Sequence, residues 1–156
     1  MLDDAYSARM LELSGRRLPE SPLGEAGPGL MGRASRHARL CGSELTAEVR
    51  LVEGRIAAHA QTVEACALGR ASAAIVAENA VGADIDELRA ARDSAARTLE
   101  TGTFDPASLP EGRWGDLALL TTLQDFRARH GSVMLAFEAV LEAAVAAQAS
   151  LTEAKG

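Results

Sequence analysis

Basic residues are scarce in this sequence and do not gather into a cluster. Lys and Arg together number 16 against 22 Asp and Glu, which gives a formal net charge of -6 and a pI near 5.1. Nucleic acids and anionic membrane surfaces both attract proteins through a basic footprint. We therefore expect no nucleic-acid partner and no membrane-surface partner.

The sequence also has little that resembles a membrane span or a secretory leader. Apolar runs such as Ala143 to Ala147 are far shorter than the about 20 apolar residues of a transmembrane helix. The acidic start Met1-Leu2-Asp3-Asp4 differs from the basic start of a signal peptide. These features predict a cytoplasmic protein that makes no membrane contact.

Cysteine occurs only at positions 41 and 66. Two cysteines in a cytoplasmic protein of this size do not suggest a disulfide framework. The chemistry of the two thiols, Cys41 and Cys66, is therefore the main functional question.

Motifs of common enzyme classes are missing. The sequence has no nucleophile elbow, phosphate loop or zinc-protease motif, and G-L-M-G at 29–32 is too short for a phosphate loop. Because no acid-base or nucleophilic group accompanies the thiols, we expect that the protein is not an enzyme.

The apolar content is sufficient for one core. With 156 residues, 47% hydrophobic and 24% charged, the chain fits a single domain spanning 1–156. Residues 16–40 hold three of the five prolines, which predicts an irregular or extended segment, part of it able to pair as a strand. Residues 150–156 are expected to form a frayed tail.

Residues 45–63 show the alternation of two half-buried strands around a Glu53-Gly54 turn. This pattern predicts an antiparallel hairpin that runs directly into Cys66. Ile56, Ala58 and Ala60 would form its second inner row, which leaves His59 as a solvated strand residue.

Helical patterns surround the hairpin. A short amphipathic helix with inner residues Leu2, Tyr6, Met10 and Leu13 is expected to open the chain and to end near Gly15. Later helices are expected from after Cys66 to about Val81, from Asp84 to Gly102, as short turns over 114–126, and from about Ser132 onward. Helix, strands and then helices indicate an α+β domain with helices on one sheet face.

Cys66 lies where the predicted hairpin becomes a helix. A helix N-terminus favours thiolate over thiol, although a cysteine can also serve as a small buried hydrophobe. Gly42 frees the backbone beside Cys41, and the hairpin is expected to bring Cys41 and Cys66 together. Two thiolates are still fewer than the four donors of a closed zinc or cluster site.

A complete site would therefore need further donors. His130 and Ser132 lie at the expected start of the last helix, where His130 is a candidate extra ligand. Ser132 has a structural explanation as an N-cap. His37, four residues before Cys41, is more typical of a surface residue than of a ligand.

Five stretches form an ordered set. They are C-G-S-E-L at 41–45, G-R-I at 54–56, A-C-A-L-G-R-A-S-A-A at 65–74, W-G-D-L at 114–117 and F-R-A-R-H-G-S-V-M-L-A-F-E-A at 126–139. They resemble, in this order, the C-G-D motif, a turn, G-C-x-I-S-x-A-S-A-S, L-G-x-L and F-P-x-R-x-x-C-A-x-L-A-W-x-A of the iron-sulfur cluster assembly scaffold family. This family comprises the IscU-type proteins and the N-terminal domain of NifU, and the resemblance runs from about residue 4 to 146.

The resemblance implies an α+β fold with a three-stranded antiparallel sheet and helices packed on one face. It also implies a site where three cysteines and an aspartate hold zinc or a nascent [2Fe-2S] cluster, supplied with sulfur by a cysteine desulfurase. Cys41 and Cys66 match two of the cysteines, while Ser43 replaces the aspartate and Ser132 the third cysteine. Gly42 and Arg129 match residues that support the site.

Both replacements put a neutral hydroxyl, a poor ligand for zinc or iron, in the place of an anionic donor. A complete ligand set would need His130, Glu44, another side chain, a bound thiol such as glutathione, or a second subunit. In a homodimer, Cys41 and Cys66 of each protomer would together supply four thiolates.

The sequence thus predicts a scaffold-like protein that binds iron, zinc or a [2Fe-2S] cluster, or accepts sulfur, through its two cysteines. Its expected partners are a cysteine desulfurase and other cluster-assembly proteins. Two alternatives stay open. One is a sulfur-transfer accessory that holds no metal, and the other is a regulatory or interaction paralogue that has lost cluster binding.

Overall fold

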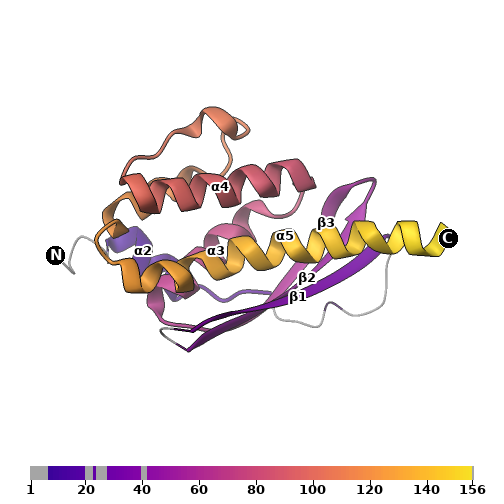
Figure 1. The fold of residues 1–156 in the computed structure, drawn as a ribbon, viewed down its shortest axis with the longest axis horizontal. Coiled ribbons are helices and arrows are strands. Elements are labelled where there is room, and N and C mark those ends of the chain that lie inside the picture. Colours follow the sequence, from indigo (N-terminus) through magenta and orange to yellow (C-terminus); the bar gives the residue numbers. More distant parts are fainter. Residues whose placement is uncertain (1–6, 20–22, 24–27, 40–41, 156) are drawn as a thin grey trace.

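The computed structural model describes residues 7–19, 23, 28–39 and 42–155. Its elements in chain order are α2 (Ala8–Ser14), β1 (Leu30–Ala38), β2 (Ser43–Val52), β3 (Arg55–Glu64), α3 (Ala67–Asn79), α4 (Ile85–Thr101), η1 (Pro106–Ser108), η2 (Gly115–Leu123) and α5 (Arg127–Lys155). Figure 1 shows the sheet below, α3 and α5 along one of its faces, and α4 farther from it. The predicted α+β architecture is confirmed.

The strands form one antiparallel sheet in the order β1-β2-β3. β1 lies inside the segment predicted to be irregular or extended. Glu53 and Gly54 both have positive φ, 53° and 79°, as a two-residue hairpin turn requires. The predicted hairpin is therefore confirmed, and alternate residues of β2, beginning with Leu45, are buried beneath the helices.

The orientation predicted for His59 is wrong. Arg50 pairs with Ala58 but Leu51 pairs with Ile56, so Ala57 forms a β-bulge. The bulge reverses the alternation that the hairpin turn sets up. His59, paired with Val49, therefore points to the helix-covered face and is only 6% exposed.

The predicted first helix is confirmed from Ala8 onward, while its expected start lies outside the described residues. Ser7 caps α2, and Met10 and Leu13 are buried. Ion pairs from Arg9 to Glu78 and Asp116 join this short helix to α3 and η2.

The predicted boundaries of α4 are also confirmed. The Asp84 carboxylate accepts a hydrogen bond from the Glu87 backbone N–H at 2.8 Å. Gly102 ends the helix with a φ of 72°. The preceding helix, α3, stops at Asn79, and Gly82 with a φ of 93° lies in the turn between the two.

α5 starts earlier and ends later than the sequence predicted. It begins at Arg127, so Ser132 is not its N-cap but a fully buried residue inside it. The helix passes through Gly131, where the space beside Ala38 of β1 would hold a Cβ at 3.6 Å. It continues to Lys155, through most of the tail expected to fray.

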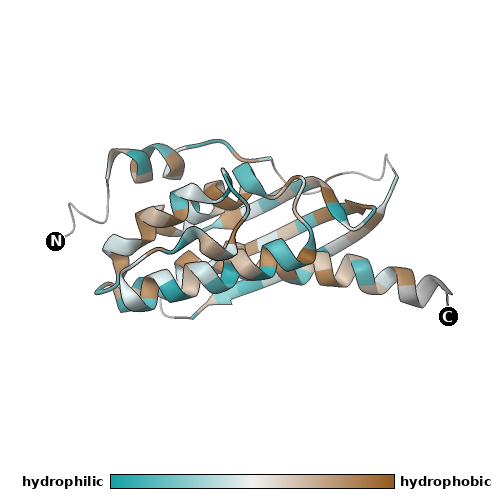
Figure 2. Cartoon of the chain, turned by 90° about the horizontal axis from the view of Figure 1, so that it is seen from above, coloured by the Kyte–Doolittle hydropathy of each residue, from teal (hydrophilic) through white to brown (hydrophobic). Residues whose placement is uncertain are grey.

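α5 is the central helix of the fold, and its last turns extend beyond the sheet (Figure 1). Within the described residues it alone is long and apolar enough to cross a membrane by length and composition, and 61% of its most apolar window is buried in the fold. Figure 2 shows the mixed teal and brown bands of helices that bury one side and expose the other.

β1 and α5 approach each other at Gly32. A Cβ there would collide with the Ala143 carbonyl and lie 2.6 Å from the Ala147 nitrogen. Only glycine allows the strand backbone to contact the helix backbone in this way.

Candidate functional site

Cys66 occupies the junction that the sequence predicted. β3 ends at Glu64, α3 begins at Ala67, and Cys66 is the N-cap with extended backbone angles of -66° and 171°. Its side chain is partly buried against the core. The sulfur thus lies at a helix N-terminus and keeps partial access to solvent.

Two serines extend from Cys66 into the protein. The Cys66 Sγ lies 3.4 Å from the Ser132 Oγ, which in turn lies 3.1 Å from the Ser43 Oγ. Both serines are buried, at 0% and 3% exposure. The two positions where the family resemblance implied a third cysteine and an aspartate therefore do converge on Cys66.

The hydroxyl of Ser132 carries one proton, so its hydrogen bonds depend on the state of the sulfur. With Cys66 protonated, the S–H can donate to Ser132, which donates to Ser43. When Cys66 ionises, the Ser132 hydroxyl can turn and donate to the thiolate. The serine stabilises both states but supplies no negative charge of its own.

The pKa of the Cys66 thiol is lowered from its ordinary value. Partial burial acts to raise it, but the hydrogen bond with Ser132, the backbone N–H groups of Gly69 and Leu68, and the charge of Arg129 together outweigh burial. A larger fraction of Cys66 is therefore thiolate at neutral pH than in a free cysteine.

Gly69 allows α3 to approach α5 at this point. A Cβ at Gly69 would lie 2.5 Å from the Ser132 Oγ and 2.8 Å from the Ala65 Cβ, closer than real Cβ atoms approach their neighbours. The short distance between Cys66 and Ser132 thus depends on a glycine that the sequence analysis did not single out. Its place within the motif at 65–74 was the available signal.

Cys41 lies outside the described residues, so its convergence with Cys66 stays a prediction. The neighbouring backbone is described: Gly42 has a φ of 66°, the left-handed conformation for which glycine was expected. Glu44 pairs with Glu64, which places the start of β2 beside the strand end that leads to Cys66.

The two histidines considered as ligands, His37 and His130, have other contacts in the structure. The His130 Nε2 is 2.7 Å from the Leu123 carbonyl oxygen, and the His37 side chain is exposed, 3.9 Å from Glu44. Across the part of the chain that the structure describes, no group of three His, Cys, Asp or Glu side chains is arranged to hold a metal ion. His130 as an extra ligand stays a prediction.

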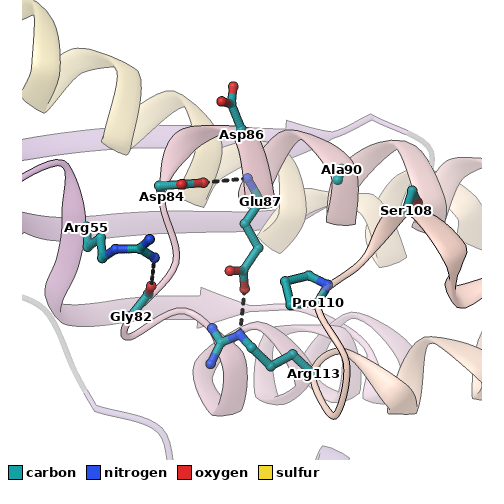
Figure 3. A pocket seen from close by; sticks show the side chains of 9 residues that line it. All are labelled: Arg55, Gly82, Asp84, Asp86, Glu87, Ala90, Ser108, Pro110 and Arg113. Atoms are coloured by element: carbon teal, nitrogen blue, oxygen red, sulfur yellow. Dashed lines mark hydrogen bonds and ion pairs between the residues drawn. The ribbon is translucent and has the colours of Figure 1, made fainter.

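Another hollow lies at the opposite end of the sheet, beside the β2-β3 turn (Figure 3). Its charged groups already bind one another: Arg113 donates to Glu87 at 2.7 Å, and Arg55 donates to the Gly82 carbonyl at 2.9 Å. Glu87 also accepts from the Trp114 ring N–H at 2.8 Å. These contacts join α4 to the loop before η2, so the groups that line the hollow have a structural role.

Solved structures share the fold described above. The N-terminal part of a nitrogen-fixing NifU-like protein from Brucella abortus is 35% identical, with 95% of this chain and 97% of that chain covered and a TM-score of 0.81. A protein assigned as an iron-sulfur cluster assembly scaffold for the SUF system of Fervidobacterium islandicum AW-1 is 18% identical, with 90% and 96% covered and a TM-score of 0.71. A hypothetical protein is 21% identical over 90% and 96%, with a TM-score of 0.72.

The latter two similarities concern the fold alone, because their sequence identity is low. No family model matches the chain, and no curated protein does so either.

Proposed function

The chain belongs to the family of iron-sulfur cluster assembly scaffolds that includes the NifU-like N-terminal domains, and from this membership we propose that it is a carrier in cluster assembly. Its cargo is a [2Fe-2S] cluster, iron, or sulfur destined for a cluster. Cys66, together with Cys41, is the attachment point. The protein acts as a carrier and not as an enzyme.

The state of Cys66 is the observation that carries this proposal. The thiol is partly exposed, its pKa is lowered, and it lies at the N-terminus of α3. Thiolate is the form of cysteine that binds metal and attacks sulfur. These properties favour attachment of cargo over the alternative of a small buried hydrophobe.

The serines determine how firmly metal cargo is held. Ser43 and Ser132 surround Cys66 with neutral hydroxyls, whereas thiolates are the usual ligands of iron-sulfur clusters. We therefore expect a cluster on this chain to be labile and readily passed on, unless a further thiol completes its ligands.

Anaerobic reconstitution tests cluster holding. The purified chain is incubated with ferric iron and sulfide, desalted, and examined by visible absorption and by iron and sulfide analysis. The wild type is expected to retain more iron and sulfide than Cys66→Ser, and Ser150→Ala should behave as wild type. Equal, colourless spectra from the wild type and Cys66→Ser would reject the cluster-holding form of the proposal.

Sulfur acceptance is the second candidate, and the lowered thiol pKa, with no group of metal-binding side chains among the described residues, favours it. In this reaction the Cys66 thiolate attacks the terminal sulfur of a desulfurase persulfide. A new S–S bond forms on Cys66, the bond in the donor breaks, and the donor leaves as a thiolate. No metal and no further oxidant are needed.

Desulfurase turnover separates this candidate from the first. Sulfur acceptance predicts that the chain activates a cysteine desulfurase, that Cys66→Ala abolishes activation, and that a chelator leaves it unchanged. Mass spectrometry should find one added sulfur on the peptide containing Cys66. If both cysteines can be replaced without loss of partner binding or activation, the chain is a regulatory or interaction paralogue.

A further inference from the structure

A polar cleft of about 390 Å³ lies at the edge of β3. Its cationic lining comes from Arg16 and Arg17, which follow α2, and from Arg70 of α3, and Thr62 and Val63 of β3 also line it. A volume of this size is at the lower end of the range of small-molecule pockets, roughly 300–1,000 Å³.

The charges in the cleft are only partly neutralised. Arg16 forms ion pairs with Glu12 and Glu78, and the Arg70 Nε donates to the Ser14 carbonyl at 3.2 Å. Arg17 has no hydrogen-bond or ion-pair partner within the described part of the chain. None of the described residues that line the cleft carries a carboxylate. In a chain with a net charge of -6, such a cleft is a local site for anions.

The cleft adjoins the functional site. Val63 comes three residues before Cys66 at the end of β3, and the Arg70 backbone N–H donates to the Cys66 carbonyl at 2.9 Å. Cys66 is the N-cap of α3 and Arg70 lies one turn farther along, about 6 Å away along the helix axis. A molecule of a few residues is long enough to span the distance between the Arg70 backbone and Cys66.

These two features, a cationic cleft and a neighbouring cysteine short of partner ligands, fit one class of molecule. We propose that the cleft binds a small thiol that carries carboxylates, of the glutathione type, and presents its sulfur beside Cys66. This inference rests on the proposed function and identifies the ligand that compensates for Ser43 and Ser132.

The carboxylates and the thiol of the bound molecule have different roles. Guanidinium groups bind carboxylates through paired, charge-assisted hydrogen bonds, so Arg17 and Arg70 hold the molecule by its carboxylates. Its thiol loses a proton to solvent as its sulfur bonds the iron of the cargo. The arginines are thus positioning residues, and the bound thiolate replaces one donor that the chain lacks.

Titration calorimetry with S-methylglutathione tests the cleft without any metal. This probe keeps the carboxylates but has no free thiol. The full chain should bind it saturably, and Arg17→Gln and the Arg17→Gln/Arg70→Gln double variant should weaken binding about tenfold or more. Arg97→Gln, which removes an exposed arginine from α4, is the matched control and should bind as wild type.

Arg17→Gln removes no hydrogen bond or ion pair within the described part of the chain, so it remains informative even if the double variant folds poorly. Absence of saturable binding to the wild type, or equal binding by all variants, would overturn the inference.

Reconstitution with two thiols distinguishes this inference from the proposed function. At equal concentrations, glutathione should give a longer-lived cluster than 2-mercaptoethanol, which has no carboxylate, and the difference should vanish in the arginine variants. Equal lifetimes with both thiols in the wild type would contradict the inference and leave the scaffold role intact. Colourless protein with either thiol would contradict cluster holding, and the calorimetry would then decide the cleft alone.

Discussion

The protonation state of the Cys66 thiol sets the charge of the described site. The neighbouring oxygens of Ser132 and Ser43 stay neutral near pH 7, so the thiol alone changes charge. The helix N-terminus and Arg129 favour its ionised form. Reactivity at this site therefore follows the pKa of a single group and not that of a coupled cluster of acids.

Replacing Ser132 with Ala should raise the pKa of Cys66. The variant loses the hydroxyl that donates to the thiolate, and the alkylation rate with iodoacetamide at pH 7 should fall about threefold to tenfold. A pH profile of the rate should shift to higher pH. Ser150→Ala, at the far end of the same helix, serves as the control; identical profiles for wild type and Ser132→Ala would contradict the role of the hydrogen bond.

Replacing Gly69 with Ala should disturb the same contact from the other side. The new methyl group has no space beside Ser132 and Ala65, so we expect a loss of about 1–3 kcal/mol in the free energy of unfolding. Urea denaturation measures this loss. Gly115→Ala, where a Cβ has open space, should have a smaller effect; similar losses in both variants would show that crowding is not the cause.

At the scale of elements, patterns that act within one element predicted the structure best. The hairpin turn, the capping of α4 by Asp84 and the junction at Cys66 each depend on residues close together in sequence. The errors lie beside contacts that a local pattern does not contain. Next to the bulge at Ala57, the Ile56 backbone bonds Gly82 and Ala83 of the turn after α3, and Gly131 lies beside Ala38 of β1.

As with the fold, only those parts of the functional site that lie within local motifs could be predicted. The motif spacing identified Cys66 and the two serine positions, because these residues lie in matched stretches. The arginine cleft could not be predicted, since Arg16 and Arg70 come from separate elements and only the fold brings them together.

Alanine substitutions at two glycines of the contact between β1 and α5 are expected to change stability in opposite directions. Gly32→Ala forces a methyl group into the helix backbone, so we expect a loss of about 3 kcal/mol or failure to fold. Gly131→Ala instead adds a methyl group at ordinary contact distance within the helix, and should be neutral or stabilise by up to about 1 kcal/mol. Thermal and urea denaturation compare the variants, and a reversed order would contradict the packing described.

At the scale of the whole molecule, His59 makes stability depend on pH. Desolvation by burial lowers its pKa from 6.5 to about 4, so the unfolded chain binds a proton between these values and the folded chain does not. The free energy of unfolding is therefore highest, as far as His59 is concerned, above pH 6.5, and it decreases as the pH falls toward 4. The shift corresponds to about 3 kcal/mol at most.

His59→Leu should therefore flatten the fall in unfolding free energy between pH 6.5 and 4. It also removes the buried Nε2, which has no hydrogen-bond partner among the described residues, so stability at pH 7 should not drop greatly. Urea denaturation at several pH values measures the slope. His37→Gln, which alters an exposed imidazole, is the control, and an unchanged slope in His59→Leu would exclude this group as the source.

The contact at Gly32 also has a mechanical meaning. α5 is unbroken from Arg127 to Lys155, and Ser132 lies about 16–22 Å along it from the turns that rest on Gly32. Near its other end the helix lies beside Ala38 of the same strand at Gly131, the neighbour of Ser132. β1 therefore sets the spacing between sheet and helix at two places, and the second of them lies directly beside the serine that contacts Cys66.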